Sequence, residues 1–328
     1  MEKNFLNNNQ LSFPVVSVCM ITYNQAPYIR EAIEGVLMQE TTHSFELIIS
    51  DDCSQDETRS ICRDYQKRYP DKIRLIFPER NLGISENFYT TLFSATGKYI
   101  AFCEGDDYWI DPQKIQKQVD FLEKNVEIGC VYTDFNMYHQ QEERMEKSLF
   151  HTRPAHFPIH TDLESFISHP LYLAPCTWMF REELLDRPPF HSVDATFVLM
   201  AHFLSQTKIH YMPDTTAVYR NLPESASHSA SQVKMYKRVS GLYWTQVSLI
   251  DFYGLSEKSK KMIDEFYFNT YLQLLISWGS QRELKEARRV LKRRRVKRGY
   301  WIRLQISRCQ FGCWIVKLLD RRLQVKAG

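Results

Sequence analysis

The N-terminal part of the chain alternates between short apolar runs and amphipathic stretches, and this alternation restricts the fold more than any other feature. The expected strands are residues 15–23, 45–52, 72–77 and 98–103, and the expected helices between them are residues 27–39, 54–69 and 85–96. A strand–helix repeat of this kind predicts an α/β fold, with a mostly parallel central sheet, flanking helices and right-handed crossovers.

The alternation weakens beyond Asp111. We expect helices at 113–125 and 194–206, a strand at 129–138, a strand leading into a helix at 175–186, and two short strands about Pro213 within 208–220. The predicted organisation is an N-terminal arm (1–14), a first α/β half (15–110), a second half of mixed structure (111–221), and a linker with a helical, basic C-terminal region (222–328).

The charges of the chain are unevenly distributed. The sequence has 42 Lys and Arg against 39 Asp and Glu, but residues 282–322 hold about 15 bases and about 3 acids. This basic tail suits a polyanionic partner, either nucleic acid or the anionic leaflet of a membrane. A nucleic acid is not expected, because the rest of the chain is mildly acidic. Apolar residues such as Trp301, Ile302 and Trp314 among the bases favour a membrane surface.

Cysteine usage and the apolar runs bear on the expected location. The eight cysteines are scattered without the spacing of a zinc site, which is typical of reduced cytosolic proteins. Residues 1–13 have neither the basic start nor the apolar run of an export signal. The apolar runs are shorter than the roughly 20 residues that cross a bilayer. We therefore expect a cytoplasmic protein that is peripheral at the inner face of the membrane.

Carboxylates gather at the ends of two expected strands. Asp51 and Asp52 end the second strand, and Glu104, Asp106 and Asp107 follow the fourth. Ligands of open α/β sheets bind at the carboxyl ends of the strands, so we expect these acids to share one crevice. Clustered carboxylates repel one another unless a cation, a helix cap or a substrate compensates. Carboxylates suit Mg²⁺ or Mn²⁺, so the cluster favours a divalent cation or a diphosphate ligand.

Four ordered stretches resemble a known family. They are "VSVCMITYNQAPYIREAIEGVLMQ", "ELIISDDCSQDET", "RNLGISENF" and "YIAFCEGDDYW". In this order and spacing they resemble the family 2 inverting glycosyltransferases of GT-A fold, of the kind found in bacterial surface polysaccharide synthesis. The resemblance covers roughly residues 15–220. It implies a nucleotide-binding half joined to an acceptor-binding half.

The resemblance also implies roles for particular residues. The implied nucleotide-sugar-binding residues are Thr22, Tyr23, Asn24, Asp51, Asp52, Arg80, Asn81, Gly83, Glu104, Gly105 and Asp106. The family's Asp-x-Asp motif falls on residues 104–106, so Asp106 is the implied metal ligand, and Glu104 acts on ribose or through water. The stretch "SVDATF" places the catalytic base at Asp194. The His that is common after Tyr219-Arg220 is missing, and His228 is its only nearby substitute.

The predicted function is metal-dependent, inverting transfer of a sugar from a nucleotide-diphosphate sugar to a saccharide, expected to be lipid-linked. Asp107, Tyr108, Trp109 and Arg220 are the expected contacts to acceptor or sugar. Two alternatives stay open. A nucleotidyltransferase would need a Gly-rich loop after the first strand, and residues 22–28 contain no Gly. A non-enzymatic scaffold would bind a polyanion through the basic tail.

Overall fold

The computed structural model describes residues 13–160, 162–169, 174–189, 192–223, 231–268, 274–275, 280 and 282–284. Most of the N-terminal arm, His228 and almost all of the basic tail therefore lie outside the described residues, and the predictions for them stay predictions.

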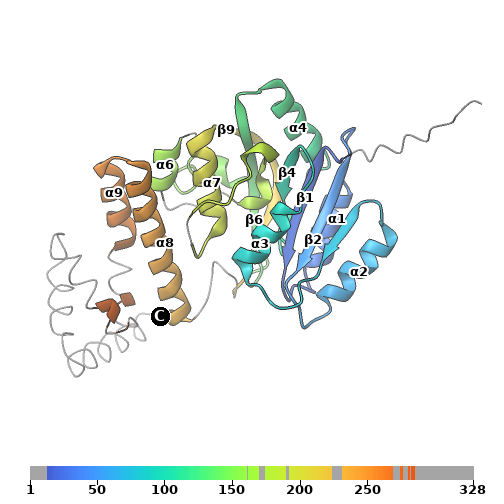
Figure 1. The fold of residues 1–328 in the computed structure, drawn as a ribbon, viewed down its shortest axis with the longest axis horizontal. Coiled ribbons are helices and arrows are strands. Elements are labelled where there is room, and N and C mark those ends of the chain that lie inside the picture. The colour runs from blue at the N-terminus through green and yellow to red at the C-terminus, as the bar shows by residue number, and fades with distance from the viewer. Residues whose placement is uncertain are drawn as a thin grey trace, which may run out of the picture.

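A single mixed sheet forms the centre of the described chain (Figure 1). Its strands are β1 (Val16–Thr22), β2 (Phe45–Asp51), β3 (Ile73–Ile76), β4 (Tyr99–Phe102), β5 (Tyr108–Trp109), β6 (Ile128–His139), β7 (Arg144–Glu146), β8 (Met179–Arg181) and β9 (Lys208–Asn221). They lie in the order β3-β2-β1-β4-β8-β6-β9-β5, and β7 pairs with the outer part of β6. The sheet thus runs through both predicted halves, whose boundary near residue 110 remains a prediction.

Helices cover the sheet and extend beyond one end of it (Figure 1). They are α1 (Ile29–Leu37), α2 (Thr58–Arg68), α3 (Ile84–Phe93), α4 (Lys114–Lys124), α5 (Leu149–Thr152), α6 (Leu163–Ser168), α7 (Ala195–Gln206), α8 (Gln232–Tyr253) and α9 (Glu257–Ile263), followed by a π-helical turn, Asp264–Phe268. The strands and helices expected in the first half are all present. None of the helices in the described ranges has the length and apolarity needed to cross a membrane.

The parallel pairing of β1, β2 and β4 explains where the site lies. β1 pairs in parallel with β2 on one side and with β4 on the other, so all three strands end at the same edge of the sheet. Thr22 is paired with Asp51 in this register. The acids predicted at the strand ends are therefore brought to one edge, as parallel pairing requires.

Two elements differ from the sequence prediction. Residues 208–221 form one long strand rather than two short ones, because β9 continues past Pro213 through a bulge. In the pairing with β6, Thr133 lies opposite Met212 and Asp134 opposite Thr215, so Pro213 falls where no ladder hydrogen bond is needed. The helix expected after β8 is only a short 3-10 turn, Glu182–Leu184.

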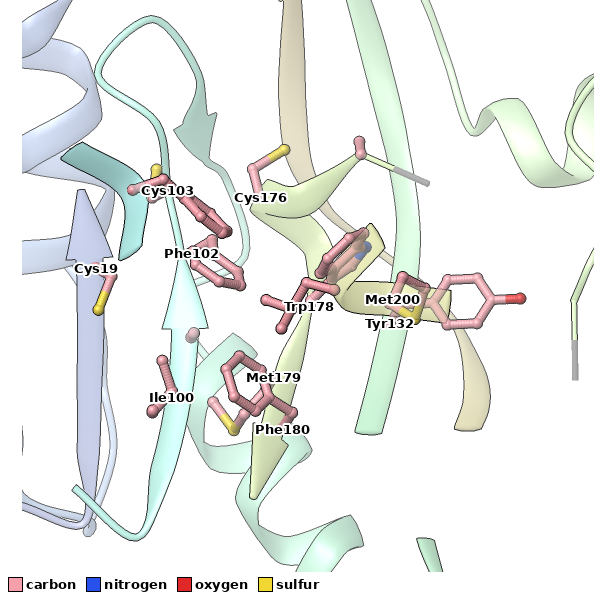
Figure 2. Packing of buried hydrophobic residues seen from close by; sticks show 14 of the residues in the cluster. Cys19, Ile100, Phe102, Cys103, Tyr132, Cys176, Trp178, Met179, Phe180 and Met200 are labelled. Carbon is pink, nitrogen blue, oxygen red and sulfur yellow. The ribbon is translucent and has the colours of Figure 1, made fainter. Parts of the chain in front are cut away.

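Aromatic packing joins the two halves of the sheet. Phe102 on β4 stacks on Phe88 of α3 with ring centroids 5.1 Å apart, and it also contacts Trp178 at 6.0 Å and Phe180 at 5.8 Å. Figure 2 shows Phe102 facing Trp178 and Phe180 across the β4–β8 pair. Because aromatic side chains bury large apolar areas, this cluster makes one continuous core.

One buried cation lies in this core. Lys114, at the start of α4, is fully buried, and its Nζ donates to Gln118 Oε1 (2.7 Å) and to the Thr177 carbonyl (2.9 Å). The same ammonium lies 5.0 Å from the centroid of the Trp109 ring. Burial lowers the pKa of Lys114 to about 7, because the charged form loses its hydration.

This lowered pKa predicts a pH dependence of stability. Above about pH 7 the unfolded chain keeps the Lys114 proton that the folded chain loses, so the free energy of unfolding rises with pH between about 7 and 10.5. Relative to Lys114→Met, we expect the wild type to gain up to about 1.4 kcal/mol per pH unit from pH 7 to 9. Urea unfolding of both proteins at pH 7, 8 and 9 measures this difference.

Lys117→Met is the matched control on the same helix. Lys117 is paired with Asp111 and Asp214, and hydrogen bonds to these carboxylates raise its pKa. It is charged in both the folded and the unfolded state below pH 10, so its replacement should shift stability equally at all three pH values. Parallel curves for the wild type and Lys114→Met would contradict the assignment.

Candidate active site

The loops that follow β1 and β2 are fastened to each other. Four hydrogen bonds join them: Asn24 N to Ser54 Oγ (2.8 Å), Gln55 N to Asn24 Oδ1 (2.7 Å), Gln25 N to Thr58 Oγ1 (2.8 Å) and Ala26 N to Asp56 Oδ2 (3.0 Å). Asn24 adopts a positive φ of 52°, a conformation that Asn tolerates better than most residues. The two loops therefore form one wall of the site, and short polar side chains hold it.

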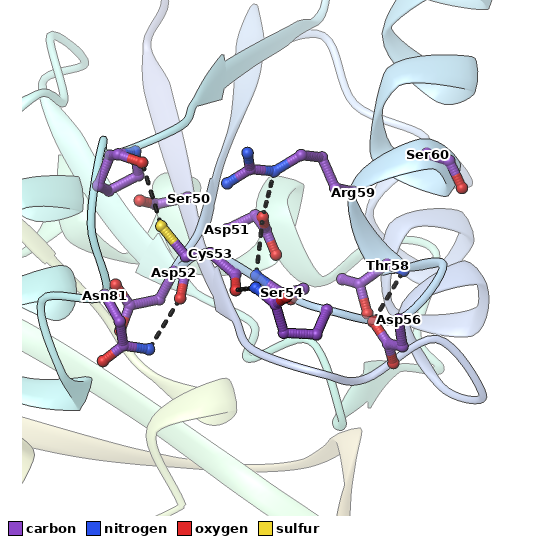
Figure 3. Close-up of polar contacts among 12 residues, drawn as sticks. Ser50, Asp51, Asp52, Cys53, Ser54, Asp56, Thr58, Arg59, Ser60 and Asn81 are labelled. Carbon is purple, nitrogen blue, oxygen red and sulfur yellow. Dashed lines mark hydrogen bonds and ion pairs between the residues drawn. The ribbon is translucent and has the colours of Figure 1, made fainter.

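Asp51 supports this wall from behind. Its carboxylate is buried and pairs with the Arg59 Nε at 2.8 Å (Figure 3). The Arg59 guanidinium lies 4.6 Å from the centroid of the Phe77 ring. Asp51 is not among the residues that line the pocket described below. The prediction that it contacts the nucleotide directly is not supported by this geometry, because its carboxylate is turned toward α2.

Asp52 lies at the pocket and holds the next loop. Its two carboxylate oxygens accept hydrogen bonds from Leu82 N (2.6 Å) and Gly83 N (2.9 Å), and its carbonyl accepts one from Asn81 Nδ2 (2.9 Å; Figure 3). Gly83 has a φ of 81°, which an L side chain rarely adopts, and it precedes α3. Arg80 is exposed and does not line the pocket, whereas Asn81 and Gly83 do.

The acidic turn after β4 packs tightly against the first loop. Gly105 N donates to the Ile21 carbonyl at 3.0 Å. A Cβ at Gly105 would lie 2.5 Å from Gln25 Oε1 and 2.9 Å from Thr22 Cβ. Only glycine fits this contact without a shift of the loop. Gly105 thus acts through its lack of a side chain and brings its two acidic neighbours up to Thr22.

The carboxylates of this turn lie close together, Asp107 buried and Glu104 and Asp106 partly buried at the pocket. Burial and the charge of Asp106 raise the pKa of Glu104 to about 8, and Asp194 contributes in the same direction. Burial raises the pKa of Asp106 and, together with its acidic neighbours, raises that of Asp107. Protons are favoured at these carboxylates because negative charges are close and the side chains have lost part of their hydration. A bound cation would relieve the same repulsion.

Several oxygens here are suited to a cation. Glu104 Oε2, Gln25 Oε1 and Thr22 Oγ1 are buried and have no hydrogen-bond partner in the described part of the chain. Together with Asp106 they provide carboxylate, amide and hydroxyl oxygens, which are the ligands that Mg²⁺ and Mn²⁺ prefer. No three His, Cys, Asp or Glu side chains among the described residues are arranged as a preassembled metal site.

Arg220 is a support of the acidic turn. Its backbone N–H donates to Asp107 Oδ1 (2.8 Å), and its side-chain Nε donates to the Asp106 carbonyl (2.9 Å). Its guanidinium also pairs with Glu31 of α1 and lies 4.9 Å from the ring centroid of Tyr28. Arg220 is 7% exposed and does not line the pocket, so in this structure it supports the acidic turn, and its contact with the acceptor stays a prediction.

The aromatic pair after the acids differs in part from the prediction. Trp109 is 1% exposed, and its Nε1 donates to the Cys176 carbonyl at 2.8 Å within the core. A ring so deeply buried offers no face to a sugar. Tyr108 lies against the guanidinium of Arg220, 5.3 Å from its ring centroid, and does not line the pocket. The predicted contact of Trp109 is therefore corrected, because this ring supports the site from the interior, whereas Tyr108 is partly exposed and its contact stays a prediction.

Asp194 caps α7 and faces the same pocket. Its Oδ1 accepts hydrogen bonds from Phe197 N (3.0 Å) and Thr196 Oγ1 (2.6 Å), which is the geometry of an N-cap. Its Oδ2 is paired with Arg238 Nη2 of α8 at 3.3 Å. One carboxylate oxygen thus serves the helix, and the other faces Arg238.

One pocket of about 950 Å³ collects most of these groups. Of the predicted site residues, it is lined by Thr22, Tyr23, Asn24, Asp52, Asn81, Gly83, Glu104, Asp106, Asp107 and Asp194. The acids of the β4 end and Asp194, about 90 residues apart in the sequence, therefore face a common space. Asp51, Arg80, Gly105, Tyr108, Trp109 and Arg220 are not among the lining residues.

Sequence reasoning missed several lining residues, and three of them bear directly on the chemistry of the site: Gln25, Lys234 and Arg238. Gln25 directly follows the predicted loop residues Thr22, Tyr23 and Asn24, and this adjacency was the available signal. Lys234 and Arg238 come from α8, beyond the region of the resemblance, and no local pattern marks them. Their place at the pocket depends on how α8 packs on the segment before α7.

Comparison with known proteins identifies the family. The sequence model of glycosyl transferase family 2 matches residues 17–187, more than half of the chain. The chain belongs to this family. An uncharacterized protein of Mycobacterium tuberculosis is 33% identical over 215 residues, which are 66% of this chain and 61% of that protein. The chain thus spans less than two thirds of that relative's length.

Other relatives carry more informative names. A Bacillus subtilis protein named as a putative teichuronic acid biosynthesis glycosyltransferase is 35% identical over 136 residues, 41% of this chain and 52% of its own length. S. aureus TarS, solved with UDP-GlcNAc, has a TM-score of 0.56 at 20% identity and covers 89% of this chain and 79% of its own. A Pyrobaculum calidifontis mannosyltransferase, solved with GDP-Man and Mn²⁺, has a TM-score of 0.51 at 16% identity, over 94% of this chain and 88% of its own.

These likenesses confirm two predictions from the sequence. The family 2 match confirms the resemblance read from the four motifs. The structural likeness to TarS confirms the GT-A type of α/β fold, with a central sheet flanked by helices. The family match ends at residue 187, before Asp194, so the second wall of the pocket lies outside it.

The contact at Gly105 gives a prediction for this site. In Gly105→Ala the new methyl group must displace Thr22 or Gln25, which we expect to cost about 1–3 kcal/mol of stability and to weaken nucleotide binding, since the acids and the first loop move apart. Urea unfolding and nucleotide titration measure the two effects. Gly254→Ala, at a positive φ of 63° at the end of α8, is the control. It should lower stability without altering nucleotide affinity, and equal affinity losses in both variants would contradict the proposed packing role.

Proposed function

We propose that this protein transfers a sugar from a nucleotide-diphosphate sugar to a saccharide acceptor with inversion at the anomeric carbon, in cell-envelope polysaccharide synthesis. One observation carries the proposal: a single pocket has Glu104 and Asp106 on one wall and Asp194 on the other. Direct displacement needs this opposition, with stabilisation of the leaving diphosphate on one side and a base for the attacking hydroxyl on the other.

The donor site is proposed to follow the strand ends. Three findings support a nucleotide-sugar donor. The chain belongs to glycosyl transferase family 2, TarS was solved with UDP-GlcNAc, and the mannosyltransferase was solved with GDP-Man. Thr22, Tyr23 and Asn24 with Asp52 line the part of the pocket proposed for the nucleotide. Asp51, Gly105 and Arg220 act behind them, because they hold the lining residues in place.

A divalent cation is proposed at Asp106, with Glu104 nearby. Such an ion fits the buried oxygens of Thr22, Gln25 and Glu104, which have no hydrogen-bond partner among the described residues, and it fits the raised pKa of Asp106. The mannosyltransferase solved with Mn²⁺ also supports a cation. When bound, Mg²⁺ or Mn²⁺ supplies positive charge that stabilises a leaving diphosphate. Mg²⁺ is usually held by one or two carboxylates together with substrate phosphates, which matches the small number of carboxylates here.

Asp194 is the proposed catalytic base. Its Oδ1 is fixed by the α7 cap, so the carboxylate is oriented, and its Oδ2 is available to take the proton of the acceptor hydroxyl when Arg238 moves or shares it. General-base catalysis is worth roughly a hundred- to ten-thousand-fold in rate. The proposed mechanism gives no role to His228, the residue noted above as a substitute for the His that is common after Tyr219-Arg220.

A lipid-linked acceptor at the inner face of the cell membrane completes the proposal. The basic tail would bind the anionic leaflet, at about 1 kcal/mol for each base near the surface. The name of the teichuronic acid relative supports an envelope polysaccharide.

A screen of nucleotide sugars tests the donor assignment. The full-length protein is heated with UDP-, GDP- and dTDP-sugars, each with Mn²⁺, with Mg²⁺ and with EDTA. A ligand that binds only the folded state raises the melting temperature by mass action, so we expect one nucleotide series to stabilise the protein, and only with the cation. Turnover of that donor with a lipid-linked saccharide, followed by product NMR, should give the inverted anomer. Stabilisation by no nucleotide, or a retained anomer, would refute the proposal.

The membrane contact has its own test. The bases within residues 292–298 can be replaced together by Gln, and vesicles with and without anionic lipid are then sedimented with each protein. Substitution is preferable to truncation, because Leu284 is buried in the core and Glu283 accepts a hydrogen bond from Tyr236. We expect the substituted protein to lose binding to anionic vesicles and to keep nucleotide binding. Undiminished sedimentation would refute the role of these bases.

A further inference from the structure

Helix α8 forms a wall of the pocket, although the family match ends well before it. Lys234 and Arg238 of α8 line the pocket together with Val193 and Asp194. Residues four apart on a helix lie on the same face, so one face of α8 presents both cations to this space.

The segment before α7 is held along α8 at three successive points. Arg238 Nη2 lies 3.3 Å from Asp194 Oδ2, and Thr245 Oγ1 donates to Ser192 Oγ at 3.1 Å. Between them, a Cβ added to Gly241 would lie 2.5 Å from a Val193 methyl carbon, so the helix backbone approaches this segment closely. The position of the two cations relative to Asp194 is thus set by packing.

The charges around the pocket are segregated. The described lining residues include five carboxylates, at Asp52, Glu104, Asp106, Asp107 and Asp194, and their two cationic residues are both on α8. Both cations therefore lie on the same side of the pocket as Asp194, the proposed base. The opposite wall, made by the loops after β1 and β2, has no Lys or Arg among the described lining residues. With Asp194 as the proposed base, the hydroxyl that reacts approaches from the Asp194 side of the pocket.

We propose that Lys234 and Arg238 form a subsite for an anionic group, a phosphate or a carboxylate, carried by the acceptor saccharide next to the hydroxyl that reacts. This inference rests on the proposed function, and it names the class of acceptor. A neutral saccharide has no group that matches two cations, whereas guanidinium and ammonium groups are strong partners of phosphate and carboxylate oxygens.

The ion pair between Arg238 and Asp194 is compatible with this subsite. A guanidinium carries five N–H donors, so it can contact Asp194 and an oxyanion at once. Without this intervening cation, an anionic acceptor would be repelled by Asp194. An oxyanion held there fixes the acceptor beside the carboxylate that takes its proton, and such orientation is a large part of catalysis.

The same chemistry has a second possible source, the diphosphate of the donor. The two assignments differ in which binding affinity depends on Lys234 and Arg238. A diphosphate contact would make nucleotide affinity depend on them, whereas an acceptor subsite would leave nucleotide affinity unchanged and make the affinity for charged saccharides depend on them.

The test compares charged and neutral saccharides on the full-length protein, with and without saturating nucleotide and Mn²⁺. The probes are N-acetylglucosamine 6-phosphate with N-acetylglucosamine, and glucuronic acid with glucose, titrated by calorimetry or ligand NMR. We expect at least one charged probe to bind about tenfold more tightly than its neutral counterpart, since a charge-assisted hydrogen bond contributes on this scale. Comparison of the phosphate and the carboxylate probe shows which anion is preferred.

The variants are Lys234→Gln, Arg238→Gln and the double substitution. Each should reduce the preference for the charged probe, and the double substitution should abolish it, while the nucleotide dissociation constant stays within about twofold of the wild type. Lys237→Gln removes an exposed charge from the same helix outside the pocket, and it should keep the full preference. Melting temperatures show whether Arg238→Gln disturbs the fold. If it does, the comparison of Lys234→Gln with the wild type decides the test.

Two results would overturn the subsite. Equal binding of charged and neutral probes by the wild type is the first. A tenfold or larger loss of nucleotide affinity in the double variant is the second, because it would assign the cations to the diphosphate. Failure of every nucleotide to bind would refute the proposed function instead, and the comparison without nucleotide would still decide the subsite.

Discussion

Asp106→Asn is expected to lower kcat about a thousandfold or more and to abolish the dependence of nucleotide binding on a divalent cation. The amide keeps the size of the side chain but removes the negative charge that would hold the ion. A cation at a leaving diphosphate is worth several kcal/mol in the transition state, and each 1.4 kcal/mol is a factor of ten in rate. The fold should persist, because burial raises the pKa of Asp106, which is partly buried among other acids, and the substitution removes a repelling charge.

Three measurements on this variant separate its effects. Donor turnover gives kcat, nucleotide titration with and without Mn²⁺ gives the cation dependence, and urea unfolding gives the stability. Asp71→Asn, which removes an exposed acid away from the pocket, is the control and should behave as the wild type. Wild-type turnover and Mn²⁺ dependence in Asp106→Asn would remove Asp106 from the metal site.

Asp194→Asn is expected to lower kcat roughly a hundred- to ten-thousand-fold, the range that general-base catalysis contributes. Nucleotide affinity should change little, since a base acts in the transition state and makes no contact with the nucleotide. Asn is as good an N-cap as Asp, so the hydrogen bond from Phe197 N to Oδ1 can be kept and the start of α7 preserved.

The cap itself provides the matched comparison. Asp194→Ala removes both the base and the cap, so it should lose activity as Asn does and also lose about 1 kcal/mol of stability. Thr196→Val removes a hydroxyl that donates to Asp194 Oδ1 at 2.6 Å but leaves the carboxylate in place. It should keep most of the activity. If Asp194→Asn retains full turnover, Asp194 is a structural cap only.

Local patterns were sufficient for the first half of the fold and for the acids of the site. The apolar runs at β1, β2 and β4 and the helical spacing between them predict parallel strands, and parallel strands end at one edge of the sheet. That rule alone brings Asp52, Glu104 and Asp106 to one pocket, because strand order and strand direction decide the position of a strand end.

Side-chain direction and long-range packing were decided only in the tertiary structure. Asp51 and Asp52 are adjacent in the sequence, but one pairs with Arg59 and the other faces the pocket, since successive side chains leave a strand on opposite sides. Trp109 follows the acids by two residues and is nevertheless buried, because β5 turns it into the core, where its Nε1 donates to the Cys176 carbonyl.

The largest gap between sequence and structure concerns partners that are distant along the chain. Arg220 pairs with Glu31, 189 residues away, and Arg238 with Asp194, 44 residues away. Periodicity and strand-end position are local properties, so the sequence by itself determined the α/β architecture and the acidic edge. Which side chains support that edge, and that α8 closes the pocket with two cations, follow from contacts between distant segments, which form only when the whole core packs.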